Sequence, residues 1–303
     1  MTSMEIASLS SKRILIVGIV RNGAQTLRSE IEALRTSFSH FKSVTFYIVE
    51  SDSEDNTVEV LTSLKKQISN FDYKTLGNVR EKIQERIRRI SFCRNTYVEY
   101  VHANKDKFDY VVVADLDGVN TLLNSEKVLS CWSRSDWDVC TANQVGPYYD
   151  IYALRAKEWS ERDCWNEARA LYSSGMNPVK AWVRAIQKKQ ILIPEDSDWI
   201  EVKSAFGGLA IYSIKAFLVG KYDVISASES RVSEHVPFHE EICSKHMRMY
   251  INPRLTNFDF NIHNDFKRLS RRSKLLLKYL LSIASPSFFV SRFMPELQLD
   301  RKG

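Results

Sequence analysis

Short apolar runs rich in β-branched residues alternate along the first half of the chain with stretches in which apolar residues recur every three or four positions. The run from Tyr110 to Ala114 is almost unbroken, which is typical of a strand buried on both faces of a parallel sheet. We expect strands over residues 13–20, 44–49, 110–114 and 137–142, and helices over residues 27–38, 58–68 and about 79–103. This alternation predicts an α/β fold with a mostly parallel sheet flanked by helices.

Two aspartates directly follow the run that ends at Ala114. Asp115 and Asp117 are separated by one residue. Ligands of open α/β sheets bind beyond the carboxyl ends of the strands, where two such carboxylates can reach one divalent cation that carries a diphosphate. Alone, the pattern fits a solvated Asp-rich turn equally well. Glu50 also stands at the end of an expected strand, so it should lie at the same edge of the sheet.

Two other observations concern the binding of a diphosphate. The chain has no Gly-rich loop of the dinucleotide or P-loop type, so a nucleotide bound here would need another source of positive charge, such as a metal on the aspartates. Arg94 occupies a position on the apolar stripe of the helix expected over residues 79–103. A guanidinium there must be paired, because desolvating its charge is costly. Its partner is either a structural carboxylate or a bound phosphate.

The later part of the chain gives weaker signals. The stretch from residue 143 to about 200 is aromatic-rich and irregular, and its rings fit either a core or a sugar-binding surface. Gly207 and Gly208 form a hinge before a further expected strand, and paired glycines allow another backbone or a ligand to approach closely. His235 and His239 have the spacing of a helical metal pair, but Pro237 between them argues against a helix interior and hence against a zinc site.

Composition and charge limit the remaining possibilities. The chain has 303 residues, a net charge of +6, and five cysteines without a Cys-x-x-Cys pair, which indicates reduced thiols. We find neither a signal peptide nor a run of roughly 18 apolar residues that could span a membrane, and we therefore expect a cytoplasmic protein. We divide the chain into a flexible leader (1–12), one α/β domain (13–266, with halves 13–118 and 119–266) and a C-terminal tail (267–303).

Much of the positive charge lies in that tail. Six basic residues and no acidic residue lie between Lys267 and Lys278, and a leucine-rich stretch follows. Such a basic amphipathic helical segment is typical of a protein that binds anionic lipid, and residues 267–293 are the predicted contact. A C-terminal helix docked on the domain is an equal alternative. Nucleic-acid binding is not expected, because the basic block is local and no recognition fold accompanies it.

Several short motifs together resemble the GT-A glycosyltransferases, which use nucleotide sugars and have a Rossmann-like sheet with an Asp-x-Asp metal motif. More narrowly, the chain resembles the fungal capsule-associated α-1,3-mannosyltransferase family and its bacterial relatives over about residues 13–265. The motifs that carry the resemblance are VESDSEDNT, Arg94-Asn95, Asp115-Leu116-Asp117, the stretch from Tyr149 to Arg155, Ser233-Glu234-His235-Val236 and Tyr250-Ile251-Asn252-Pro253.

The resemblance implies a role for each of these residues. Asp115 and Asp117, with His263, would hold Mn²⁺ or Mg²⁺, while Arg94 would add a fixed charge beside the diphosphate. Glu234 and His235 would be catalytic, with Glu234 as the general base if the enzyme inverts, although His235 replaces the aspartate that is commoner after it. The remaining donor contacts would come from Val20, Arg21, Glu50 and Leu116, and the acceptor side would be lined by Asp150, Arg155, Gly207 and Gly208.

The sequence hypothesis is therefore a metal-dependent glycosyltransferase. It would move a hexose from a UDP- or GDP-linked donor to a surface glycan acceptor such as lipopolysaccharide or capsule, with the basic tail at the inner face of the membrane. Two alternatives remain at this stage. One is a sugar nucleotidyltransferase, whose usual Gly-rich N-terminal signature is missing here. The other is a non-catalytic membrane-surface scaffold that retains the fold.

Overall fold

The computed structural model describes residues 9–227, 229, 231–259, 290, 294 and 297. In this part of the chain, eight strands form one sheet in the order β3-β2-β1-β4-β7-β5-β8-β6. The strands are β1 (Arg13–Val20), β2 (Ser43–Glu50), β3 (Phe71–Thr75), β4 (Tyr110–Ala114), β5 (Val139–Val145), β6 (Ile200–Glu201), β7 (Leu209–Ser213) and β8 (Met249–Asp259). The expected α/β class with a mostly parallel sheet is confirmed.

The N-terminal part of the sheet is parallel and the C-terminal part is mixed. β1 pairs in parallel with both β2 and β4, and β2 pairs in parallel with β3. β7 then runs antiparallel between β4 and β5, while β5 and β8 are parallel to each other. Because β1, β2 and β4 point the same way, their carboxyl ends lie at one edge of the sheet, as the sequence pattern predicts.

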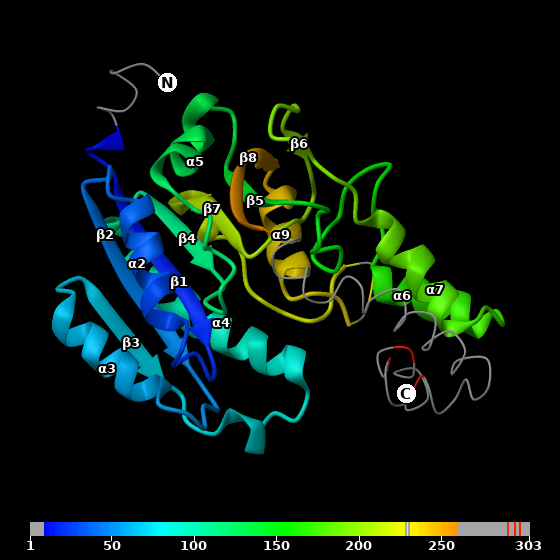
Figure 1. Cartoon of the computed structure of the whole chain (residues 1–303), viewed down its shortest axis with the longest axis horizontal. Coiled ribbons are helices and arrows are strands. Elements are labelled where there is room, and N and C mark those ends of the chain that lie inside the picture. The colour runs from blue at the N-terminus through cyan, green and yellow to red at the C-terminus, as the bar shows by residue number, and fades with distance from the viewer. Residues whose placement is uncertain are drawn as a thin grey trace.

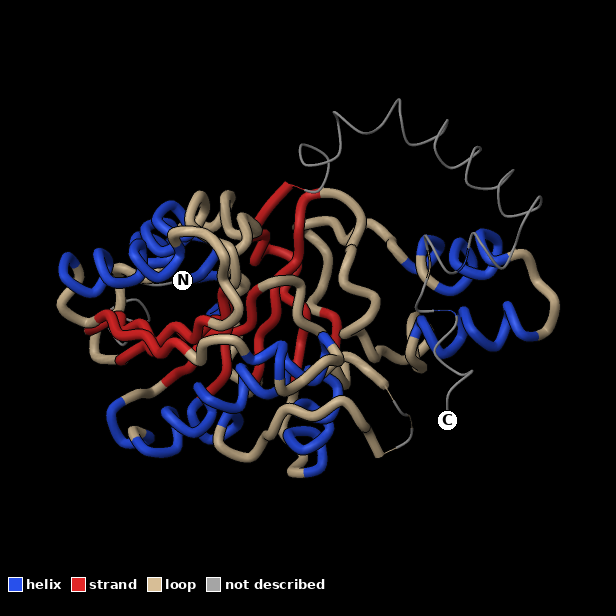
Figure 2. Tube along the Cα trace, turned by 90° about the horizontal axis from the view of Figure 1, so that it is seen from below, coloured by secondary structure: helices blue, strands red, loops and turns tan. Residues whose placement is uncertain are grey.

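Helices cover both faces of the sheet, which makes three layers (Figures 1 and 2). Side chains of successive strand positions alternate between the layers, so that Leu15 joins one hydrophobic cluster and Ile16 the other. The cluster containing Ile16 includes α2 (Leu27–Ser37), α3 (Thr57–Gln67) and α5 (Ser125–Leu129). The cluster containing Leu15 includes α4 (Arg86–Ala103), α6 (Cys164–Ser173), α7 (Pro178–Ala185), α8 (Ile214–Phe217) and α9 (His235–Ser244).

The structure departs from the expected elements in four places. β3 was not expected, and the long helix over about 79–103 is divided into a 3₁₀ turn (Val79–Glu81) and α4. The expected strand 137–142 begins two residues later and extends to Val145. The stretch expected to be irregular contains α6 and α7, which lie at the end of the molecule opposite β3 (Figure 1).

Three described residues come from the C-terminal tail. Val290, Met294 and Leu297 are each buried and belong to the same hydrophobic cluster as α4. The rest of the tail, His263 and residues 1–8 of the leader lie outside the described residues. Among the residues that are described, no helix is long and apolar enough to cross a membrane.

Candidate active site

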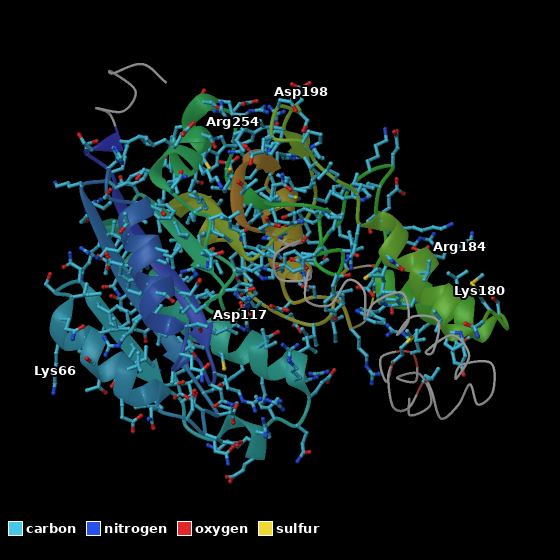
Figure 3. The ribbon with its side chains drawn as sticks, in the orientation of Figure 1. Lys66, Asp117, Lys180, Arg184, Asp198 and Arg254 are labelled. Carbon is cyan, nitrogen blue, oxygen red and sulfur yellow. The ribbon has the colours of Figure 1, made fainter. Side chains whose placement is uncertain are left out.

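A pocket of about 630 Å³ opens at the carboxyl edge of β1, β2 and β4. Its walls come from the ends of these strands, the first turns of α4, the loop after β5 and the start of α9. Figure 3 shows Asp117 near the middle of the molecule, between the N-terminal strands and the later elements. Of the residues assigned from sequence, the pocket is lined by Val20, Arg21, Arg94, Asp115, Leu116, Asp117, Asp150, Glu234 and His235.

The loops after β1 and β2 form the first wall. The Asn22 side chain accepts a hydrogen bond from the Glu54 backbone N–H (2.8 Å), and Ser53 Oγ accepts one from Asn22 N–H (3.0 Å), so the two loops hold each other. Asp55 accepts from the N–H of Thr57 at the start of α3, a structural role that its sequence position favours. These hydrogen bonds between the two loops fix the shape of this wall of the pocket.

Glu50 lies at the end of β2 as expected, but its side chain turns into the protein. It is 2% exposed, and its Oε1 accepts from the backbone N–H of Ser53 (3.0 Å). The following residues, Ser51 and Asp52, line the pocket in its place. Asp52 has a positive φ of 59°, which turns the chain away from the strand direction and brings its carboxylate to the wall.

The two aspartates after β4 present unequal carboxylates to the pocket. Asp117 is exposed, whereas the Asp115 side chain is 31% exposed and lies 3.2 Å from Arg94 Nη2. The backbone of Asp115 is fixed at both ends, because its N–H donates to Gly208 O (2.9 Å) and its carbonyl accepts from Asn120 Nδ2 (2.8 Å). Burial raises the pKa of Asp115 to about 7, although the nearby Arg94 charge acts in the opposite direction.

Arg94 joins the Asp-x-Asp motif to the start of α9. Its Nε donates to Glu234 Oε1 (2.9 Å), its Nη2 to Asp115 Oδ1 (3.2 Å) and its Nη1 to the Tyr97 hydroxyl (3.0 Å). The Phe206 ring lies 5.3 Å from the guanidinium carbon. The sequence left open whether this buried cation pairs with a carboxylate or a phosphate. In this structure its partners are two carboxylates, and both belong to the pocket.

The loop after β5 supplies Asp150, and the paired glycines hold it. Asp150 Oδ2 accepts from Gly207 N–H (3.1 Å), and burial raises the pKa of Asp150. A Cβ on Gly207 would stand 2.6 Å from Ala142 O, and one on Gly208 would stand 3.0 Å from Val119 Cγ2. The two glycines therefore act behind the pocket surface: their small size lets β7 approach β5 and the Asp115 backbone closely.

Arg155 is the assigned residue that the structure places furthest from its expected role. It is 6% exposed and is not part of the pocket wall. Its Nη2 donates to Asp163 Oδ2 (3.0 Å), and Asp163 in turn caps the first turn of α6. The family resemblance implied a place for Arg155 on the acceptor side. Instead, its buried charge pairs with the buried Asp163 carboxylate, and the pair ties the loop to α6.

Helix α9 begins at His235, and Glu234 immediately precedes it. Pro237 was expected to disrupt a helix here, but it lies in the first turn, where its missing N–H costs no intrahelical hydrogen bond. His235 and His239 do lie on one side of the helix, with ring centroids 5.6 Å apart. Within the described residues no group of three or more His, Cys, Asp or Glu side chains could hold a metal ion.

Several pocket residues were not identified from sequence. Arg86 and Arg89 of α4 both line the pocket, and Arg89 Nε lies 4.0 Å from Asp52 Oδ2. Tyr149 and Tyr152 line it too, so part of the aromatic stretch faces a ligand site while Tyr148 is in the core. Arg86, Arg88 and Arg89 lie in the first turns of α4, where positive charges are unfavourable beside the helix dipole, and they were a sequence signal for an anion site in addition to Arg94.

A comparison with known protein families indicates to which class of protein the chain belongs. The family described as Cryptococcal mannosyltransferase 1 matches residues 13–249. The chain belongs to this family. This membership confirms the resemblance seen in the sequence, and it favours a glycosyltransferase over the nucleotidyltransferase and scaffold alternatives. No curated protein sequence matches the chain.

Similar folds occur among solved structures. Mannosyltransferase PcManGT from Pyrobaculum calidifontis, solved with GDP-Man and Mn²⁺, has a TM-score of 0.47 at 10% identity and covers 82% of this chain and 57% of its own. TarS residues 1–349 from S. aureus has a TM-score of 0.45 at 10% identity, with coverages of 90% and 66%. The same TarS segment with UDP-GlcNAc gives 0.43 at 11% identity, with 79% and 55%. The chain thus spans less than two thirds of each of these proteins.

Proposed function

We propose that this protein is a metal-dependent glycosyltransferase, which transfers a hexose from a nucleoside diphosphate sugar to a glycan acceptor of the cell surface, such as a lipid-linked glycan. The observation that supports this most directly is the composition of one pocket. Two carboxylates of the Asp-x-Asp motif and four arginines (Arg21, Arg86, Arg89 and Arg94) line a volume of about 630 Å³ at the carboxyl edge of the parallel strands.

The residues present fit a hard divalent cation. Mg²⁺ and similar ions are commonly held by one or two carboxylates together with water and substrate phosphates, and Asp115 and Asp117 offer such a pair at the pocket wall. Asp117, being exposed, is the better placed of the two. When bound, Mn²⁺ or Mg²⁺ would neutralise the charge that develops on the leaving diphosphate. His263, the proposed third ligand, lies outside the described residues and stays a sequence prediction.

The arginines of the pocket have a role that is separate from that of the metal ion. Arg94 holds Asp115 and Glu234 in fixed positions, so the carboxylate of the metal motif and a carboxylate of α9 keep a constant spacing. Arg21, Arg86 and Arg89 place further guanidinium groups around the same pocket, where they would contact the diphosphate of the donor. Residues at the ends of β1 and β2, with Ser51 and Asp52 in the place first assigned to Glu50, would contact the nucleoside.

The metal assignment can be tested with a panel of sugar nucleotides that includes GDP-mannose and UDP-N-acetylglucosamine. We expect Mn²⁺-dependent hydrolysis of at least one donor, and we expect Asp117→Asn to lower it by about 100-fold or more. The Asp117 side chain is exposed, so folding should be unaffected. Asp106→Asn, also at an exposed aspartate, is the matched control. Turnover of Asp117→Asn within a few-fold of the unsubstituted protein would contradict the metal site.

An inverting transfer also needs a group that accepts the proton of the acceptor hydroxyl, and the pocket holds two carboxylates for this role. Glu234 is held by Arg94, whereas Asp150 accepts from the backbone N–H groups of Gly207 and Ala153. Burial raises the pKa of Asp150, which makes its carboxylate a stronger base. We propose that one of them is the base. The amide variant of the base should lower kcat by about 100-fold or more at unchanged donor affinity. If both Glu234→Gln and Asp150→Asn retain kcat, the reaction uses no such base.

The basic tail supports a location at an anionic membrane surface. Residues 267–278 carry six basic side chains, and the proposed acceptor is anchored in lipid. We therefore propose that the enzyme acts in the cytoplasm, peripherally at the inner face of the membrane. Vesicle binding, described in the Discussion, tests this independently of donor turnover.

A further inference from the structure

His235 is a buried pocket residue whose two ring nitrogens have no hydrogen-bond partner in the part of the chain that the structure describes. It is 3% exposed and lines the pocket. Neither ring nitrogen has a hydrogen-bond partner among the described residues. The nearest carboxylate oxygen, Glu234 Oε1, lies 3.7 Å from Nε2, which is longer than a hydrogen bond. A buried, unpaired polar group is costly, so such groups in native proteins usually meet a ligand or an ordered water.

The ring cannot easily turn to find a partner within the protein. It stacks on Phe206 with a centroid distance of 4.0 Å and an interplanar angle of 22°. Tyr222 packs against it edge-on at 5.5 Å, and His239 lies on the same helix at 5.6 Å. Contacts on several sides fix the plane of the imidazole, so the directions of its two nitrogens are set before any ligand binds.

His239 shows what the same side chain does when its role is structural. It lies four residues further along α9, is fully buried, and does not line the pocket. Its Nδ1 lies 2.9 Å from Ser204 Oγ and its Nε2 lies 2.8 Å from the Tyr212 hydroxyl. Both of its nitrogens are therefore satisfied. The contrast locates the missing partner of His235 on the pocket side.

The chemistry of that partner follows from the state of the ring. Burial and the adjacent Arg94 charge hold the pKa of His235 well below its ordinary range, so the imidazole is neutral and carries one donor and one acceptor. A phosphate offers acceptors only and is already matched by the arginines of the pocket. A hydroxyl can both donate and accept, so it suits either ring nitrogen.

We propose that His235 binds a hydroxyl group of a hexose held in this pocket and thereby selects the sugar. This inference rests on the proposed transferase function and replaces the catalytic role that the motif suggested. The hydroxyl belongs either to the donor sugar or to the acceptor sugar, and the two sources share the same chemistry.

The test compares His235→Phe with His239→Phe. Phenylalanine keeps the stacking surface and removes the nitrogens. His235→Phe should keep or raise the melting temperature, because it removes an unpaired polar group. It should leave binding of the nucleoside diphosphate with Mn²⁺ unchanged. His239→Phe should lower the melting temperature, because it leaves the hydroxyls of Ser204 and Tyr212 without their partner, yet it should not change sugar selectivity.

Monodeoxy sugars, each lacking one hydroxyl, then locate the contact. The unsubstituted protein should discriminate against one analogue by about 10-fold or more in kcat/KM, and His235→Phe should lose that discrimination. Loss during donor hydrolysis without acceptor assigns the contact to the donor sugar, and loss only during transfer assigns it to the acceptor.

The outcomes separate this inference from the function on which it rests. If the unsubstituted protein neither binds a nucleoside diphosphate with Mn²⁺ nor turns over any donor, the proposed function is wrong. If it turns over a donor and His235→Phe keeps the full preference for every hydroxyl, the inference is wrong and a water molecule satisfies the ring. The inference would also be wrong if His235→Phe weakened binding of the nucleoside diphosphate as much as it weakened binding of the sugar nucleotide, because the contact would then not be to the sugar.

Discussion

At the scale of single residues, Arg94 shows how a sequence signal can be detected and its partner still be missed. Its place on an apolar stripe indicates that the charge must be paired. Which partner it takes depends on Glu234, 140 residues away, and on Asp115. No local pattern brings these three together, because their meeting depends on how α9 packs across the sheet. The sequence could therefore identify an important arginine but not the carboxylate cluster around it.

Arg94→Met provides a direct measure of this cluster. The sequence alone predicts weaker diphosphate binding with little loss of stability. The structure changes that expectation, because the substitution leaves Glu234 and Asp115 without their shared cation. Removing one partner of a buried ion pair costs about 3–5 kcal/mol, so we expect a loss of that size in the free energy of unfolding, measured with urea.

The control for this substitution is Arg88→Met on the same helix. Arg88 pairs with Glu85 at the surface, where its side chain is 56% exposed. Exposed pairs contribute about 0–1 kcal/mol, so this variant should be nearly as stable as the unsubstituted protein. If Arg94→Met is no less stable than Arg88→Met, the ion pairs of Arg94 with Glu234 and Asp115 do not stabilise the protein.

At the scale of elements, prediction succeeded where apolar runs were long. β1 and β4 have the bounds that the sequence pattern indicates, because both are central strands covered on both faces. β3 was missed because an edge strand such as Phe71–Thr75 carries polar residues, which leave no apolar run. The helices α6 and α7 were missed because the stretch was interpreted from its aromatic content and not from its helical period.

Capping residues mark the start of both helices. Asp163 caps α6 and Asn177 caps α7, each with its side chain accepting from backbone N–H groups of the first turn. Pro178 follows Asn177 at the first helical position, where proline is favoured. The start signals of both helices are therefore in the sequence. The sequence does not indicate, however, in which direction α6 and α7 extend from the sheet.

Gly207 allows a second test, at the junction of two strands. It has φ +68°, and a Cβ would stand 2.6 Å from Ala142 O, whereas Gly77 has φ +66° and no atom within 4 Å of its Cβ position. Both alanine variants pay roughly 1–2 kcal/mol for a left-handed backbone. Gly207→Ala also forces the strands apart, so it should be less stable than Gly77→Ala by about 1–3 kcal/mol in thermal or urea unfolding. Equal losses would show that the close approach is not needed.

At the scale of the whole molecule, the C-terminal tail is linked to the domain. Val290, Met294 and Leu297 are 0%, 7% and 4% exposed and belong to the cluster that contains α4. Deleting the chain after residue 266 would remove these apolar contacts along with the basic block. A truncated protein that loses vesicle binding could therefore have lost its fold, and substitutions are the cleaner test.

Replacing four basic residues of the tail with glutamine tests the membrane proposal. Each basic residue near an anionic surface contributes about 1 kcal/mol, so the joint change at Lys267, Arg268, Arg271 and Arg272 should weaken binding to phosphatidylserine vesicles by about 100-fold or more. Sedimentation with vesicles at two salt concentrations measures this, since screening should also weaken binding.

The control removes the same charge from the surface of the N-terminal half. Lys42, Lys66, Lys74 and Lys82 are exposed, and their replacement with glutamine changes the net charge equally. Vesicle binding should then be nearly unchanged. A similar loss in both variants would mean that overall charge, and not the tail, attracts the protein to the membrane.

The antiparallel insertion of β7 has a consequence for how the protein is made. β4 pairs on one side with β1 and on the other with β7, which lies about a hundred residues later in the chain. A nascent chain that has emerged only as far as Gly118 would leave the β4 edge open beside the Asp-x-Asp motif. Such open edges invite pairing with other chains. The first half supplies most of the pocket residues but lacks the strand that covers the β4 edge. We therefore expect fragments ending near residue 118 to aggregate where fragments that include β7 and β5 do not.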